Sequence, residues 1–136
     1  MRHRKTALLI GITVLLATAA WSREDKLTNT GLDPSAQGTV VTSNDRNGNT
    51  EVEVKVKHLA RPTALVPPHQ AYLVWVQPRG AQPELLGALK VNDDLEGSLK
   101  ATTTRKDFEV LVTAEDGLNP QVPSSNVLLR GGVERK

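Results

Sequence analysis

Short β-type segments recur along this chain from residue 38 onward, and they constrain its fold more than any other feature. The clearest covers residues 50–58, where three valines alternate with charged side chains. Alternation with a period of two is typical of a strand that has one buried face and one wet face. Turn signals separate these segments, and Asn47-Gly48 is the sharpest of them because both residues tolerate positive φ. The pattern predicts seven strands, at residues 39–43, 50–58, 71–77, 85–91, 98–103, 108–114 and 126–130.

Seven short strands, with no helical pattern between them, favour an all-β fold, namely an antiparallel immunoglobulin-like β-sandwich. Residues 71–77 are apolar on both faces, which predicts a central strand covered on each side. Residues 60–70 contain three prolines and are therefore predicted to form a connecting loop. The chain has no cysteine, so no disulfide staples the fold and its core is predicted to be aliphatic.

The amino-terminal segment has the layout of an export signal. Arg2, Arg4 and Lys5 precede an uncharged run of 15 residues at positions 6–20. As a helix this run would measure roughly 22 Å, short of the ~30 Å hydrocarbon core, which favours a signal peptide cleaved after Ala19. Trp21 at its end suits the alternative, a retained single membrane anchor formed by residues 6–21. Both alternatives place the following residues outside the cytoplasm, either periplasmic or secreted, or held at the membrane with the carboxy terminus outside.

The domain organisation predicted from these features has three parts. Residues 1–22 form the signal peptide or single membrane anchor, an apolar helix that precedes the β-sandwich. Residues 23–37 have few apolar side chains and are predicted to be a flexible linker. Residues 38–133 form the β-sandwich domain. Of the 17 Lys and Arg residues three lie in the leader, so the remaining 14 face 15 acidic residues and no nucleic-acid-binding character is expected.

Several polar groups of the sequence are candidate sites. His58 and His69 do not match zinc-ligand spacing and are interpreted as surface or edge residues. Residues 92–97 resemble the start of a calcium loop, but position twelve is Thr103 rather than glutamate. We therefore expect a solvated hairpin turn in which Gly97 takes positive φ, with a weak cation site as the alternative. Glu115 and Asp116 are adjacent on a strand and should point to opposite faces, and Ser124-Ser125 has no nucleophile motif. We therefore predict no catalytic, cofactor-binding or metal-binding residues and no cofactor.

The order of motifs from Tyr72 onward resembles the extracytoplasmic carboxy-terminal domain of the anti-sigma-K factor family. The matching elements are an aromatic-x-x-Trp strand at Tyr72–Trp75, a Leu-Gly strand at residues 86–89, a Val-x-Val-Thr-x-Glu strand at residues 110–115, and a Gly- and Pro-containing loop before residues 127–131. The resemblance implies an all-β module outside the membrane, in which Tyr72 and Trp75 are packing positions. The sigma-binding cytoplasmic part of that family has no counterpart here, because only five residues precede the apolar run.

These observations favour a non-enzymatic, extracytoplasmic protein-interaction or sensory module at the membrane, with a protein partner outside the cytoplasm. The alternative is a secreted module that binds carbohydrate or cell wall. That function usually needs exposed aromatic platforms, for which only Tyr72, Trp75 and Phe108 are available. Burial of these three side chains would weaken the alternative, and a cleft joining a histidine to carboxylates would favour an enzyme.

Overall fold

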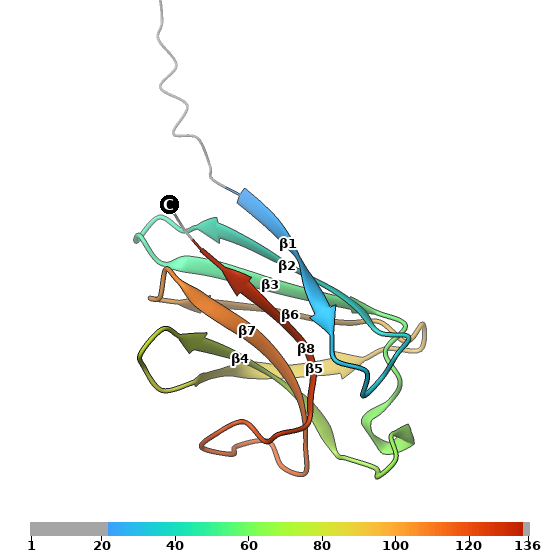
Figure 1. Cartoon of the computed structure of the whole chain (residues 1–136). Coiled ribbons are helices and arrows are strands. Elements are labelled where there is room, and N and C mark those ends of the chain that lie inside the picture. Colours follow the sequence, from blue (N-terminus) through green and yellow to red (C-terminus); the bar gives the residue numbers. More distant parts are fainter. Residues whose placement is uncertain (1–21, 135–136) are drawn as a thin grey trace, which may run out of the picture.

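The computed structural model describes residues 22–134, which form a single all-β body (Figure 1). The one helical element among them is a short 3-10 turn, η1, at Pro62–Ala64. Each of the seven predicted strands is present, and an eighth strand precedes them. The strands are β1 (Ser22–Asn29), β2 (Gln37–Asn44), β3 (Thr50–Lys57), β4 (Ala71–Pro78), β5 (Glu84–Val91), β6 (Gly97–Thr103), β7 (Phe108–Glu115) and β8 (Val127–Val133).

The strands close into one antiparallel barrel in the order β1-β2-β3-β6-β5-β4-β7-β8. Two seams complete the closure. At the first, β1 pairs with β2 over residues 22–27 and then with β8 through Thr28 and Asn29. At the second, β5 pairs with β4 over most of its length and with β6 through Lys90 and Val91. The barrel thus has two walls, one built around β2, β3 and β6 and the other around β4, β7 and β8. Strands β1 and β5 each pair with both walls.

The prediction of an immunoglobulin-like β-sandwich is therefore wrong, because a sandwich leaves its sheet edges open whereas both edges are hydrogen-bonded here. The pairing of β5 with β4 has a β-bulge between Val74 and Trp75 of β4. This bulge bends β5, so that β5 continues from its pairing with β4 into its pairing with β6. The predicted flexible linker at residues 23–37 is also wrong in its first half, because residues 23–29 belong to β1. The predicted β-domain accordingly extends to Ser22, while the predicted leader helix, anchor and cleavage site lie outside the described residues.

The barrel interior is aliphatic, as predicted. The inward-facing residues of β3 are Val52, Val54 and Val56. Those of β7 alternate in the same way and are Phe108, Val110, Val112 and Ala114. Tyr72 is the largest side chain of this cluster. Because β4 is buried on both faces, its other side builds a second cluster, in which Ala71, Leu73, Trp75 and Leu111 pack with Leu85, Ala88 and Val127.

The two ends of the barrel differ. Antiparallel order places Ser22, Glu134 and the short connections at residues 45–49, 79–83 and 104–107 at one end. The connections at residues 30–36, 58–70, 92–96 and 116–126 lie at the opposite end, which we call the loop end (Figure 1). Strands of eight residues separate the two ends by roughly 26 Å. The longest loops are thus held far from the point where the chain enters the body.

Candidate functional site

The loop end is the candidate functional site, since loops presented by a rigid scaffold are where binding residues concentrate. Its loops are fixed by buried polar groups. The buried Asp33 carboxylate accepts the N–H of Ala60 at 2.9 Å, and the Tyr72 hydroxyl donates to the carbonyl of the same residue at 2.6 Å. Burial raises the pKa of Tyr72 well above its usual value, and the nearby negative charge of Asp33 raises it further by a smaller amount. The phenol therefore stays protonated and keeps donating this hydrogen bond.

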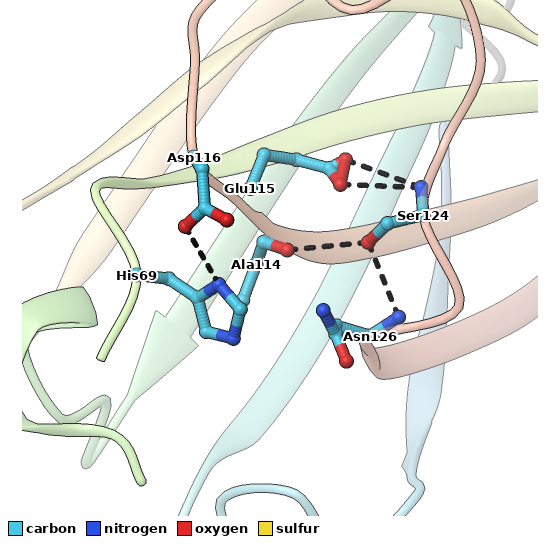
Figure 2. A network of polar contacts seen from close by, with 6 residues as sticks. All are labelled: His69, Ala114, Glu115, Asp116, Ser124 and Asn126. Atoms are coloured by element: carbon cyan, nitrogen blue, oxygen red, sulfur yellow. Dashed lines mark hydrogen bonds and ion pairs between the residues drawn. The ribbon is translucent and has the colours of Figure 1, made fainter. Parts of the chain in front are cut away.

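Loop 58–70 is joined by two contacts to the last residue of β7 and the first residue of loop 116–126. The N–H of Gln70 donates to the carbonyl of Glu115 at 3.0 Å. The side chain of His69 meets the Asp116 carboxylate, with 3.0 Å between Nδ1 and Oδ1 (Figure 2). The predicted surface position of His69 is wrong, because only 8% of the residue is exposed. By contrast His58 is exposed, at the end of β3, with φ of 55°.

Loop 116–126 is braced internally by a second set of contacts. Both carboxylate oxygens of the buried Glu115 accept the N–H of Ser124, at 3.1 and 3.2 Å. The Ser124 hydroxyl donates to the carbonyl of Ala114 at 3.3 Å and accepts the N–H of Asn126 at 3.2 Å. Figure 2 shows that Glu115, the last residue of β7, and Asp116, the first residue after it, extend to different partners. The Glu115 carboxylate therefore holds loop 116–126 through Ser124, while the Asp116 carboxylate contacts His69 of loop 58–70.

Serine, histidine and aspartate all occur in this network, yet their geometry is not that of a nucleophile and its base. A catalytic serine donates its hydroxyl proton to the histidine. Here the Ser124 hydroxyl is bonded to backbone atoms, and the hydrogen bonds drawn in Figure 2 join His69 to Asp116 alone. Asp116 itself is largely exposed, at 75% of its side chain, so the pair lies at the rim of the loops rather than in a cleft.

The other predicted polar site is a turn held by its own side chain. The Asn92 side-chain oxygen accepts the N–H groups of Asp94 at 3.0 Å and Glu96 at 2.9 Å, so it caps the turn. The positive φ in this turn is at Leu95, with 58°, and not at Gly97 as predicted, since Gly97 is already the buried first residue of β6. Across residues 22–134, no group of three or more His, Cys, Asp or Glu side chains is placed to hold a metal ion.

Sequence reasoning missed the apolar side chains that the loop end exposes. Val66 is 93% exposed on loop 58–70, and Leu118 and Val122 are 62% and 59% exposed on loop 116–126. Each lies within two residues of a proline, in Leu-Val-Pro-Pro and Leu-Asn-Pro-Gln-Val-Pro. Prolines stiffen an exposed loop and lower its ordering cost, so apolar residues flanked by prolines were the signal that could have identified this site. We call these three side chains the apolar loop tips.

The aromatic residues that could serve carbohydrate binding are buried, Tyr72 and Phe108 in the barrel interior and Trp75 in the second cluster. Tyr72 is fully buried, and Trp75 and Phe108 are 1% and 4% exposed. The Trp75 indole N–H is also occupied, because it donates to the Thr113 hydroxyl at 2.9 Å. The described residues therefore present no aromatic platform of the kind that stacks on sugar rings, which removes the support for the carbohydrate-binding alternative.

Comparison with known proteins adds no relative: no family model, curated protein sequence or solved structure matches this chain. In the part of the chain that the structure covers, no helix has both the length and the apolar character needed to span a membrane. The functional assignment accordingly rests on the geometry of the barrel and its loops.

Proposed function

We propose that this chain is a non-enzymatic protein-interaction module outside the cytoplasm, and that its loop end contacts an apolar surface of a protein partner. The observation that carries this proposal is the exposure of Val66, Leu118 and Val122 on two loops that are hydrogen-bonded to each other. Exposed apolar side chains on fixed loops bind with little loss of conformational entropy. The buried polar groups that fix these loops hold the exposed side chains in place for binding.

The arrangement of the two barrel ends supports an outward-facing role. Ser22 and Glu134 lie at the end opposite the apolar loop tips, and the Arg23 guanidinium donates to the carbonyl of Glu134 at 2.7 Å. If residues 6–21 stay in the membrane as an anchor, the body begins at the membrane and its loop end points away from it. This polarity suits a module like the outer domain of an anti-sigma-K factor, the family that the order of sequence motifs resembles.

Site-specific photocrosslinking in cells tests this function. A photoreactive amino acid replaces Leu118 or Val122 in the full chain, and a control replaces Asn47, at the opposite end. We expect a discrete crosslinked product from the two loop positions and none from Asn47. The product formed from Leu118 should weaken at least fivefold when Val66→Ser is added. Equal crosslinking at both ends, or no product from the loop positions in correctly exported protein, would refute the proposal.

A further inference from the structure

Four lysines from three strands that are well separated in the sequence, β1, β3 and β5, come together on the outer face of one barrel wall. The pairing registers align Lys26 of β1 with Thr39 of β2, Thr39 with Lys55 of β3, Lys55 with Ser98 of β6, and Ser98 with Lys90 of β5. This row therefore crosses five adjacent strands, and Lys57 lies two residues from Lys55 on the same face. We call Lys26, Lys55, Lys57 and Lys90 the lysine row.

The spacing within the row is regular. Neighbouring strands are about 4.8 Å apart, so lysines two strands apart have backbones roughly 10 Å apart. Hydroxyl groups of Thr39 and Ser98 occupy the strands between them. Ammonium groups alternating with hydroxyl groups form a line of hydrogen-bond donors that suits a succession of phosphate groups. A line that runs across the strands fits an extended chain rather than a single small anion.

The surface is hollowed on either side of β3. One hollow, of about 650 Å³, is lined by Lys26, Lys55 and Lys57 together with Glu24. The other, of about 450 Å³, is lined by Lys55, Lys57 and Lys90 together with Glu96. Each hollow thus has three lysines against one glutamate, and the two share the lysines of β3. Because the two hollows share Lys55 and Lys57, we call the pair of them the basic track. It occurs in a chain that has 14 basic and 15 acidic residues beyond the leader.

Among the residues that the structure describes, three of the four lysines of the row have no acidic partner. Farther along β3 the charges neutralise each other: the Lys100 ammonium lies 2.7 Å from the Glu51 carboxylate. In the row itself Lys55 lies 2.9 Å from Glu53. Within residues 22–134, Lys26, Lys57 and Lys90 form no ion pair. The unpaired lysines thus gather on one half of the wall, where their mutual repulsion is relieved when an anion binds.

We propose that the lysine row binds an extended polymer of phosphate groups, such as a phosphodiester chain, along the outer face of β1, β2, β3, β6 and β5. The binding is independent of the apolar loop tips and of the protein partner proposed for them. Since the contacts are mainly between ammonium and phosphate, affinity depends on the number of linked phosphates and falls with rising salt.

Binding of long-chain inorganic polyphosphate to the purified protein tests the proposal. We expect saturable binding at low salt, with monomeric inorganic phosphate binding at least a hundredfold more weakly. The triple variant Lys26→Gln, Lys57→Gln and Lys90→Gln should lose at least tenfold in affinity and show a shallower salt dependence. The matched control Arg46→Gln, Arg79→Gln and Lys106→Gln removes the same charge from the short connections near Ser22 and Glu134. Its affinity for polyphosphate should fall less than threefold.

Two further arms distinguish the sources of phosphate. Vesicles of phosphatidylcholine with 30% phosphatidylglycerol test a lipid headgroup, and a 20-base-pair duplex tests nucleic acid. Both should bind more weakly than polyphosphate. A lipid headgroup carries a single phosphate, and a duplex presents its two phosphodiester strands wound around each other and not as one extended chain. Tighter binding to either probe, no binding of polyphosphate, or equal losses in the two triple variants would overturn the proposal. Circular dichroism of both triple variants verifies that the barrel is intact.

Discussion

Leu27 is the side chain through which β1 closes the barrel, and its truncation gives the sharpest test of the fold. It is the one buried apolar residue of β1. Two glycines make room for it: a Cβ built on Gly131 would lie 2.8 Å from its Cδ2 atom, and one built on Gly38 would lie 3.1 Å from its Cδ1 atom. Leu27 therefore fills a slot formed by neighbouring strands that have no side chain at that point.

Leu27→Ala should lower the free energy of unfolding by about 3 kcal/mol. Removing three methyl or methylene groups accounts for roughly 2.4 kcal/mol of lost transfer energy. The remainder reflects the cavity, which the facing glycines cannot fill. Urea unfolding followed by circular dichroism measures the change. Leu118→Ala is the control, since this exposed leucine should cost less than about 0.5 kcal/mol.

A double-mutant cycle makes this test specific. Gly131→Ala alone forces its new methyl group against Leu27 and should cost about 1–3 kcal/mol. In the Leu27→Ala background the atom in closest contact is gone, so the added methyl group partly fills the cavity. We expect a coupling of at least about 1 kcal/mol between the two substitutions. Additive effects, or a loss below about 0.5 kcal/mol for Leu27→Ala, would show that residues 22–29 do not pack as β1.

Three further substitutions test the interior and the loop end. Thr42→Val should raise the free energy of unfolding by about 1 kcal/mol, because the buried Thr42 hydroxyl has no hydrogen-bond partner among the described residues; a loss in urea unfolding would contradict this. His58→Gly should stabilise by about 0.5 kcal/mol, since an exposed histidine at φ 55° carries backbone strain that glycine lacks; an unchanged or lower urea midpoint would argue against strain. Tyr72→Phe removes the hydrogen bond to Ala60 and should cost about 1 kcal/mol at neutral pH. It should also flatten the loss of stability above about pH 10, because the raised pKa keeps Tyr72 protonated in the folded state while the unfolded phenol ionises; an equally steep decline in the variant would refute this assignment.

Thr113→Val is the matched control for Thr42→Val. The buried Thr113 hydroxyl accepts the Trp75 indole N–H at 2.9 Å, so the same chemical change leaves a buried donor without its partner. We expect it to lower the free energy of unfolding by about 1–3 kcal/mol. The opposite signs of the two substitutions distinguish an unpaired hydroxyl from a general preference for valine in strands.

The sequence could predict part of the loop end but not its connections. Prolines at residues 62, 67 and 68 indicated the loop before β4, and the adjacent carboxylates of Glu115 and Asp116 were expected to diverge. The burial of His69 against Asp116 joins residues 47 positions apart, and no local pattern encodes such a contact. For the same reason the sequence could not predict the lysine row, because its members are neighbours only through the pairing registers of five strands.

Seven strands and an aliphatic interior were determined by the sequence alone, because alternation at i and i+2 and the turn residues act over a few neighbouring positions. Closure into a barrel was decided by the tertiary structure. β1 is polar except for Leu27, so it lacks the apolar alternation from which a strand can be predicted. Its pairing with β8 and that of β5 with β6 each involve two residues per strand. Such pairings form only when distant segments are already aligned, and this is why the edges of the predicted sandwich are joined in the folded protein.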